Sequence, residues 1–419
     1  MEKLVIEGGH ALKGEVRVSG SKNAALPVLA ATLLTDDECV LRNIPRLRDT
    51  MTMVKLLRSL GKTIDIGKDS VTVSKGPSNH VAEYKLVSTM RGSFCVLGPL
   101  LAKLGKAKVS LPGGCVIGIR PVDLHIKGIK ALGAKIDFDS GYVVASAHRL
   151  KGNHMYLGGG FGSSVLATAN VMMAATLADG ETIIESAACE PEIEDLANFL
   201  MAMGAKIKGK GTPQIAVQGV KKLHGANFRI SSDRIEAGTF ILLAAALRSN
   251  ITIRETNFMH LLALLDKLEE AGMRFEKEYN LIRLKCSRHL KPTSITTFPY
   301  PGFPTDLQAQ FMALMAMTPG VSVITDKVYP DRFIHIAELN RMGASIRREG
   351  SNAIVEGVKT LHGAPVMASD LRASSALIIA GLAAKGKTEI HRIYHLERGY
   401  ENLDEKLATM GAKIYREKE

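Results

Sequence analysis

A glycine-centred motif recurs six times along the 419-residue chain, and this repeat limits the possible folds more than any other feature. The copies read LGKTIDI, LGAKIDF, MGAKIKG, AGMRFEK, MGASIRR and MGAKIYR, with glycines at positions 61, 133, 204, 272, 343 and 411. The glycines are separated by 72, 71, 68, 71 and 68 residues. Each follows a helix-like apolar pattern and precedes a short strand pattern, so each is predicted to end a helix with a positive φ.

The rest of each unit repeats as well. A helix rich in small apolar residues is followed by a strand, a loop, the second helix, the glycine and a pair of strands, which predicts six βαβαββ units in an α/β fold. KLVIEGGHALKG near the N-terminus matches the unit-ending strands QIAVQGVKKLHG and NAIVEGVKTLHG, whereas only one strand follows Gly411. The N-terminal strand is therefore predicted to complete the sixth unit.

This arrangement predicts two domains of three units each. The first covers residues 22–230, and the second combines residues 1–21 with residues 231–419. A solenoid of six stacked units used as a binding scaffold is the alternative. A solenoid needs polar capping repeats at its ends, and the sequence has none, so two closed domains fit better.

Composition narrows the range of partners that the chain can be expected to bind. The chain is 46% hydrophobic and has no apolar run near 18 residues, which indicates a soluble protein. Its five cysteines are scattered and form no CxxC pair, which favours free thiols in a reducing cytoplasm. The net charge is +12, but there is no tryptophan and no basic run of five, so small anions are favoured over nucleic acid as partners.

Polar residues recur where the first helix of each unit is predicted to begin. Helix N-termini offer unpaired N–H groups to phosphate and carboxylate. Ordinary capping accounts for the Ser, Thr and Asp residues at these places, but not for Lys22, Arg91 or Arg372, because cations oppose the helix dipole there. Lys22 and Arg91 are therefore candidate anion ligands. Arg120 and Arg398 lie beside the predicted starts of second helices, where a surface salt bridge is the alternative.

Cys115 lies in LPGGCVIGIRPVD, between glycines that let the backbone move as a lid. A nearby cation such as Arg120 lowers the pKa of a thiol and makes it a better participant in proton transfer. The alternative is that Cys115 is an ordinary small residue in a surface loop.

Four motifs are similar to one known family. They are SGSKNAALP (19–27), LPGGCVIGIRPVDLH (111–125), FPTDLQAQFMAL (303–314) and YHLERGYENLDEKL (394–407). Together they resemble the UDP-N-acetylglucosamine 1-carboxyvinyltransferases, a family of enolpyruvyl transferases, and the resemblance runs from end to end. It implies two domains, each a threefold βαβαββ assembly called an inside-out α/β barrel.

The resemblance also implies the chemistry. The enolpyruvyl group of phosphoenolpyruvate would pass to the 3′-hydroxyl of UDP-N-acetylglucosamine, and phosphate would leave, as the first committed step of peptidoglycan synthesis. Neither a metal nor an organic cofactor is implied, and the oligomeric state is left open. Cys115 would donate a proton and react with the epoxide fosfomycin.

The resemblance assigns the other site residues to one or the other of the two substrates. Lys22, Arg120 and Arg398 would bind phosphoenolpyruvate, with Asn23 orienting the reacting groups. Asp306 would contact the sugar and is favoured as the base, and Asp370 would be the second carboxylate in the proton transfers. The expected contacts to the nucleotide sugar are Arg91, Arg120, Pro121, Val122, Asp123, Leu124, Ser164, Asp306 and Val328.

Two places depart from the family pattern. Many members have a KVSVG-like stretch at the uridine diphosphate, whereas this chain has GGGFGSSVLAT, in which the lysine is absent and only Ser164 aligns. Glu397 stands where an aspartate is common, beside the retained Arg398.

Other functions remain as alternatives. The shikimate-pathway enolpyruvyl transferase shares the fold and the donor but lacks the PGGC loop. A silent binding protein or an RNA-end-processing relative is the second alternative. His391 and His395 have helical metal spacing, but TEIHRIYH is predicted to be a strand and no HExxH motif supports a metal.

Overall fold

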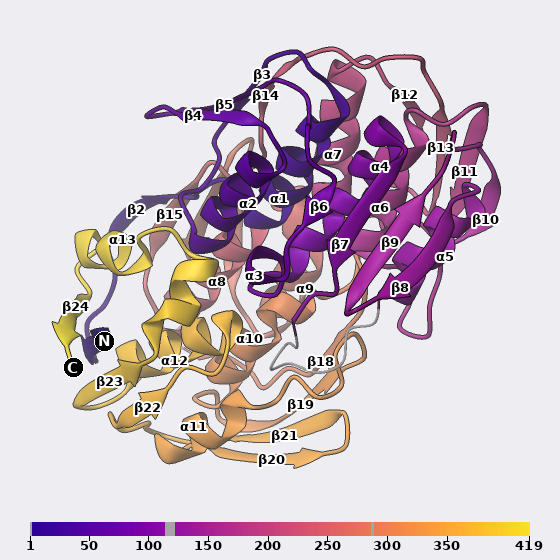
Figure 1. The fold of residues 1–419 in the computed structure, drawn as a ribbon. Helices are drawn as coiled ribbons and strands as arrows, with labels where there is room; N and C mark the ends of the chain where they lie inside the picture. The colour runs from indigo at the N-terminus through magenta and orange to yellow at the C-terminus, as the bar shows by residue number, and fades with distance from the viewer. Residues whose placement is uncertain (1, 114–121, 286–288) are drawn as a thin grey trace. The chain divides into compact units, whose positions relative to one another are not determined.

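The computed structural model describes residues 2–113, 122–285 and 289–419 (Figure 1). These residues fall into two compact units. The N-terminal unit contains residues 20–113 and 122–231, and the C-terminal unit contains residues 2–19 and 232–419 apart from the gap at 286–288.

The N-terminal unit contains three four-stranded sheets and the helices that join their strands. Its helices are α1 (Lys22–Ala31), α2 (Arg48–Ser59), α3 (Tyr84–Val87), α4 (Leu97–Leu104), α5 (Asp123–Ala131), α6 (Val165–Ala175) and α7 (Pro191–Ala202), with 3₁₀ turns η1 (Thr32–Leu34) and η2 (Arg91–Val96). Its strands are β3 (Cys39–Arg42), β4 (Thr63–Ile66), β5 (Ser70–Ser74), β6 (Val81–Ala82), β7 (Lys106–Ser110), β8 (Lys135–Asp139), β9 (Tyr142–Ser146), β10 (His154–Tyr156), β11 (Glu181–Glu185), β12 (Lys206–Lys208), β13 (Gln214–Gln218) and β14 (Asn227–Arg229).

The C-terminal unit has the same plan. Its helices are α8 (Arg234–Ala246), α9 (Leu262–Glu270), α10 (Gln308–Met315), α11 (His335–Arg341), α12 (Leu371–Ala383) and α13 (Leu403–Thr409), with 3₁₀ turns η3 (Phe258–Leu261), η4 (Thr305–Leu307) and η5 (Ile393–Arg398). Its strands are β1 (Glu2–Glu7), β2 (Gly14–Arg17), β15 (Ile251–Arg254), β16 (Arg274–Glu278), β17 (Leu281–Lys285), β18 (Ile295–Thr297), β19 (Gly320–Asp326), β20 (Ser345–Glu349), β21 (Asn352–Gly357), β22 (Pro365–Met367), β23 (Lys387–His391) and β24 (Lys413–Lys418).

All six sheets share one topology. In the sheet β10-β11-β13-β12, the first two strands are parallel and the rest are antiparallel, and the helices α6 and α7 connect them as βαβαββ. The N-terminal strand β1 lies between β23 and β24, as the sequence predicted. The six-unit pattern is therefore confirmed in the described residues.

The six repeated glycines end helices as predicted. Their φ angles are 102° at Gly61, 87° at Gly133, 101° at Gly204, 100° at Gly272, 93° at Gly343 and 96° at Gly411. Residues with a Cβ rarely adopt this backbone conformation, so the repeat marks the point where each chain segment turns from helix to strand.

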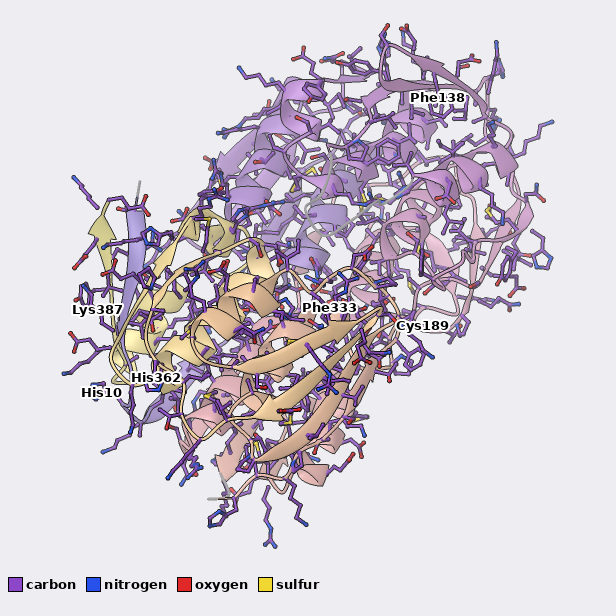
Figure 2. All side chains as sticks on the ribbon, turned by 90° about the horizontal axis from the view of Figure 1, so that it is seen from below. His10, Phe138, Cys189, Phe333, His362 and Lys387 are labelled. Carbon is purple, nitrogen blue, oxygen red and sulfur yellow. The ribbon has the colours of Figure 1, made fainter. Side chains whose placement is uncertain are left out.

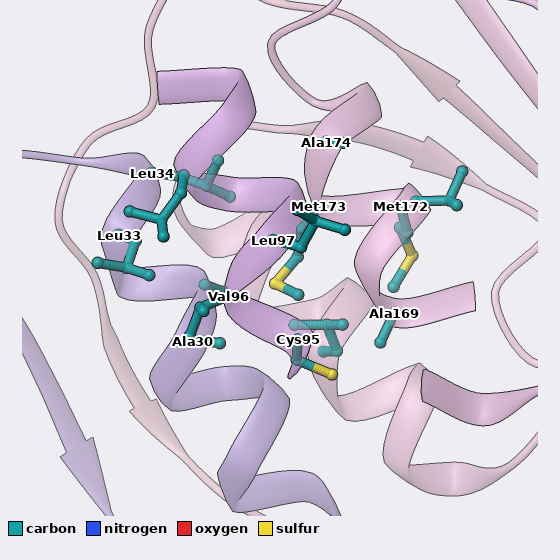
Figure 3. Packing of buried hydrophobic residues seen from close by; sticks show 14 of the residues in the cluster. Ala30, Leu33, Leu34, Cys95, Val96, Leu97, Ala169, Met172, Met173 and Ala174 are labelled. Atoms are coloured by element: carbon teal, nitrogen blue, oxygen red, sulfur yellow. The ribbon is translucent and has the colours of Figure 1, made fainter. Parts of the chain in front are cut away.

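The first helix of every unit is buried over most of its length. In the N-terminal unit, α1, α4 and α6 pack together through residues such as Ala30, Leu97, Ala169 and Met173 (Figure 3). In the C-terminal unit, α8, α10 and α12 pack in the same way. The sheets lie outside these helices, and the described strands form six separate sheets rather than a closed barrel. Because small residues line the helices, their backbones can approach closely.

The outer faces of the sheets are mainly polar. Lys387 on β23 projects outward, whereas Phe138 on β8 is an apolar exception with 61% of its surface exposed (Figure 2). No helix in the described ranges combines the length and apolar character needed to cross a bilayer, the longest having 13 residues.

The predicted strand TEIHRIYH is only partly correct. The strand β23 ends at His391, because Arg392 adopts a φ of 58° and the chain continues as the 3₁₀ turn η5. His395 therefore lies in a turn rather than a strand. The described residues contain no cluster of His, Cys, Asp or Glu that could hold a metal ion.

Candidate active site

The predicted site residues lie in both units, except for three. Cys115, Arg120 and Pro121 lie outside the described residues. The chain leads toward them through Gly113, where an added Cβ would lie 2.4 Å from the carbonyl oxygen of Ser88. Only glycine permits this close approach, so the contact with Ser88 excludes a larger residue at position 113.

Lys22 is a buried cation at the start of α1. The helix is capped by Ser21, whose Oγ accepts a hydrogen bond from the Ala24 N–H at 3.3 Å. Lys22 is 8% exposed, and its Nζ lies 3.6 Å from Oδ2 of Asp49, which is 4% exposed in the first turn of α2. Asn23 follows at the next position and is half-buried. Burying this ion pair costs desolvation energy that hydrophobic residues would avoid, which points to a functional reason for the lysine.

A buried amide links the two predicted nucleotide-sugar segments of the N-terminal unit. Asn170 on α6 donates from Nδ2 to the Phe94 carbonyl and to Nδ1 of His125, both at 3.0 Å. Its Oδ1 accepts the Gly98 N–H at 2.5 Å. Phe94 belongs to η2, which begins at Arg91, and His125 belongs to α5. Asn170 therefore fixes the start of η2 and the start of α5 relative to each other.

The protonation of His125 follows from its surroundings. The side chain is 2% exposed, and burial lowers its pKa to about 3, with the charge of Arg91 acting in the same direction. The imidazole is neutral near neutral pH, and Nδ1 can accept the hydrogen bond from Asn170. Val122, Asp123 and Leu124 lie directly before this anchored residue, at the start of α5.

We expect the buried His125 to make the protein sensitive to acid. Its pKa in the folded state is below the ordinary value near 6.5, so below pH 6.5 the unfolded protein binds a proton that the folded protein does not. The free energy of unfolding is therefore highest above pH 6.5 and decreases as the pH falls toward 3. This histidine should cost about 2 kcal/mol of unfolding free energy at pH 5 relative to pH 8. Denaturant unfolding of the wild type and His125→Asn at both pH values measures the effect. An equal pH dependence in the two proteins would contradict it.

The glycine-rich loop before α6 lies against α5. Ser164 caps α6, with its Oγ accepting the Ala167 N–H at 3.4 Å. A Cβ on Gly159 would lie 3.1 Å from Cδ1 of Leu124. One turn further along α5, the Lys127 ammonium lies 5.4 Å from the centroid of the exposed Tyr156 ring. The loop lacks a lysine, but α5 places one against Tyr156, at the end of the strand that leads into the loop, and no sequence pattern indicated this lysine.

Two arginines hold Asp306 in the C-terminal unit. Its Oδ1 accepts from Nη1 of Arg332 at 2.7 Å, and its Oδ2 accepts from Nη2 of Arg372 at 3.0 Å. The arginine side chains are 4% and 1% exposed, whereas the Asp306 side chain is 26% exposed. Burial opposes the charge on both guanidinium groups, but the nearby Asp306 more than offsets this and raises the pKa of each. The result is a fixed carboxylate backed by permanent positive charge.

Asp326 fixes the chain around Asp306 and Val328. It is fully buried and accepts hydrogen bonds from the hydroxyls of Thr297 and Thr305, both at 2.7 Å. It also accepts from the N–H groups of Val328 at 3.0 Å and Tyr329 at 2.7 Å. One carboxylate thus joins the turn η4, which carries Asp306, to the segment that follows β19.

Asp370 caps α12. Its Oδ1 accepts from the N–H groups of Arg372 at 2.7 Å and Ala373 at 3.2 Å, where the helix dipole favours a negative charge. His335 at the start of α11 interacts electrostatically with Asp370, but burial lowers the pKa of His335 to about 4. His335 is therefore neutral near neutral pH.

Arg398 ends the turn η5 and is half-buried. The preceding Glu397 binds Nη1 of Arg416 on β24 at 2.7 Å, and Arg416 also binds Asp404. The residue that departs from the family pattern thus serves an ion pair with β24.

No sequence pattern indicated a role for Arg332, and Arg372 stood out only as a cation that capping does not explain. That signal was real, because Arg372 uses its side chain for Asp306 rather than for the helix end.

Comparison with known proteins places the chain. Residues 6–407 match the EPSP synthase (3-phosphoshikimate 1-carboxyvinyltransferase) family. The chain is 51% identical over 416 residues to the UDP-N-acetylglucosamine 1-carboxyvinyltransferase of Methylacidiphilum infernorum, with 99% of each chain covered. It is 52% identical over 419 residues to that of Lawsonia intracellularis, with 100% of each chain covered. The chain belongs to this carboxyvinyltransferase family.

Solved structures support the same fold. An enolpyruvyl transferase from Streptomyces tendae superposes with a TM-score of 0.89 at 24% identity, covering 99% of this chain and 98% of that chain. EPSP synthase from Acinetobacter baumannii gives 0.76 at 20% identity, with 100% of both chains covered. The predicted enolpyruvyl transferase fold is confirmed.

Proposed function

We propose that this chain transfers the enolpyruvyl group of phosphoenolpyruvate to the 3′-hydroxyl of UDP-N-acetylglucosamine and releases phosphate. The observation that carries the proposal is the identity of about half of all residues, over the full length, to relatives named for this transfer. The shikimate enzyme is a weaker candidate, because a solved EPSP synthase is only 20% identical. The reaction would supply peptidoglycan synthesis in the cytoplasm, with the two compact units acting as the domains 22–230 and 1–21 plus 231–419.

The chemistry has two balanced halves. In the addition, the Cys115 thiol gives a proton to the methylene carbon of phosphoenolpyruvate, and the sugar oxygen bonds to the adjacent carbon. Asp306 accepts the proton of the sugar hydroxyl. In the elimination, the Cys115 thiolate takes a proton back from the new methyl group, the double bond reforms, and phosphate departs with the proton that Asp306 accepted, so both groups return to their starting states. Asp370 serves as the second carboxylate in these transfers.

Cations are needed because both reactants are anionic. Lys22, Arg120 and Arg398 would hold the phosphate and carboxylate of phosphoenolpyruvate, with Asn23 orienting the reacting groups. The buried position of Lys22 strengthens its interaction with an anion, because nearby water is excluded.

The nucleotide end would be held by the segments around α5 and by Val328. Arg91, Pro121, Val122, Asp123, Leu124 and Ser164 are the remaining proposed contacts. Lys127 is added to them, since it contacts Tyr156 at the end of β10, the strand that leads into the loop that lacks the family lysine. Its ammonium would meet the negative charge of the diphosphate.

An assay of phosphate release tests the function. The protein is incubated with phosphoenolpyruvate and either UDP-N-acetylglucosamine or shikimate-3-phosphate. We expect phosphate release in the reaction that contains UDP-N-acetylglucosamine and none in the reaction that contains shikimate-3-phosphate. Release only with shikimate-3-phosphate would assign the chain to the other reaction, and salt-dependent RNA binding without release would favour a binding protein.

Two lysine variants separate the two substrate ends. Lys22→Ala should weaken phosphoenolpyruvate binding about tenfold or more, because a charge-assisted contact is lost, and should affect the nucleotide sugar less. Lys127→Ala should show the opposite preference. Isothermal titration calorimetry with each substrate measures both. The same preference in both variants would contradict the assignment of the two lysines.

A further inference from the structure

A tyrosine hydroxyl lies where the three buried helices of the C-terminal unit meet. Tyr400 is 3% exposed and follows Arg398 by two residues. Its hydroxyl lies 2.9 Å from Oγ1 of Thr239 on α8, 3.2 Å from Nε2 of Gln310 on α10 and 3.1 Å from Oγ of Ser375 on α12. All three partners are fully buried. One side chain thus contacts each helix of the central bundle.

The donors and acceptors can be assigned around this hydroxyl. The Ser375 hydroxyl donates to the carbonyl oxygen of Arg372 at 2.9 Å, so the proton of the Tyr400 hydroxyl is the one that joins Tyr400 to Ser375. Gln310 has two protons on Nε2. One goes to the Tyr400 oxygen, and the other goes to the Asp306 carbonyl oxygen at 2.9 Å.

These bonds form a closed ring. It runs from the Asp306 carbonyl through Gln310, Tyr400 and Ser375 to the Arg372 carbonyl. It closes through the side chains, where Arg372 binds the Asp306 carboxylate at 3.0 Å. The Arg372 guanidinium also lies 5.3 Å from the centroid of the Tyr400 ring, which is a favourable distance for a cation above an aromatic face.

We propose that Tyr400 is a positioning residue, whose hydroxyl holds the Asp306 carboxylate and the Arg372 guanidinium in register through this ring. The inference rests on the proposed function, in which Asp306 is the base. Tyr400 accepts from Gln310 of α10, which also binds the Asp306 carbonyl, and it donates to Ser375 of α12, the helix that carries Arg372. It also continues the segment that carries Arg398, so one buried residue ties three charged groups of the proposed site to the core.

Alternative candidates for the role of the hydroxyl are weaker. A purely structural hydroxyl would satisfy buried polar groups but would not need to connect the backbone of Asp306 to that of Arg372. Thr239 separates these possibilities, because its Oγ1 lies 2.9 Å from the same tyrosine oxygen and 2.8 Å from the Ile235 carbonyl oxygen, yet it is not a member of the ring.

The test compares three variants of the full chain by steady-state phosphate release. Tyr400→Phe removes only the hydroxyl, and Ser375→Ala breaks the same ring at another atom. Both should lower kcat about 10- to 100-fold, because small displacements of reacting groups are costly, with KM for either substrate changing less than about threefold. The acid limb of the kcat profile should move to higher pH as the Asp306–Arg372 pair loosens.

Thr239→Val is the matched control. It should lower the unfolding temperature as Tyr400→Phe does, but kcat should stay within about twofold of the unaltered protein. If Tyr400→Phe fails to fold, Ser375→Ala carries the test alone. Unchanged kcat in the ring variants, or an equal loss of kcat in Thr239→Val, would overturn the inference. If the unaltered protein itself released no phosphate, the proposed function would fail first, so the two failures are distinguishable.

Discussion

Cys115→Ala is expected to lower turnover at least about 1,000-fold, because proton donation by a positioned group commonly contributes factors of 10² to 10⁴. The methyl side chain cannot protonate the methylene carbon of phosphoenolpyruvate, and water would have to replace it. Phosphate release with UDP-N-acetylglucosamine at saturating substrate measures the loss. Turnover equal to that of the wild type would remove Cys115 from the mechanism.

Cys189→Ala provides a matched control. Cys189 is a half-buried free thiol, and burial raises its pKa, so it is a poor nucleophile. Its Sγ donates to the Ala187 carbonyl at 3.7 Å, and no reactive group of the proposed site contacts it in the described structure. We expect turnover within about twofold of the wild type.

Cys115→Asp separates the acid role from thiol reactivity. A carboxylic acid can still donate a proton, but it cannot attack an epoxide as a thiolate does. Partial turnover with resistance to fosfomycin is therefore expected. Loss of turnover together with retained fosfomycin labelling would contradict the assignment.

The fold was largely predictable, because the repeat has a local cause. The turn from helix to strand in each unit needs a residue with a positive φ. Glycine adopts this conformation most readily, so the requirement can be recognised in the sequence at Gly61 and its five equivalents. The predicted domain bounds assign β2 to the C-terminal domain and β14 to the N-terminal domain, but the strands with which they pair were not predictable. β2 precedes α1 in the chain but pairs with β15, and β14 precedes α8 but pairs with β3. Strands of three or four residues carry too little pattern to reveal such non-local pairing.

The motifs indicate the residues of the proposed site, which stay predictions, but they do not reveal the residues that support them. Arg332 and Arg372 lie 26 and 66 residues from Asp306, so no local spacing indicates that they share one carboxylate. Asn170 offered a signal that was missed, because it is an amide within a mainly apolar helix that is buried from Ala167 onward. A buried amide must find partners, and its partners join the segments that begin at Arg91 and Val122.

Asp306→Ala is expected to damage both stability and activity, because the same carboxylate neutralises two buried guanidinium groups. Removing one partner of a buried ion pair leaves the other charge uncompensated, and we expect a loss of about 3 kcal/mol in unfolding free energy. Asp306→Asn keeps the shape but not the charge, so it should lose less stability. Both variants lack the base and should lower kcat about 1,000-fold.

A second carboxylate–arginine pair in the same unit shows whether these effects belong to the site. Asp404 is 8% exposed and binds Nε of Arg416 at 2.7 Å. Asp404→Asn should lower the unfolding temperature and leave kcat within about twofold, because this pair touches neither proposed substrate. Urea unfolding and phosphate release on all three variants measure stability and turnover separately. Asp306→Asn with normal kcat would transfer the role of base to Asp370. Asp306→Ala with normal stability would mean that other groups neutralise the charges of the two arginines. In that case there would be no Asp306–Arg372 pair for Tyr400 to position, and its proposed role would be contradicted.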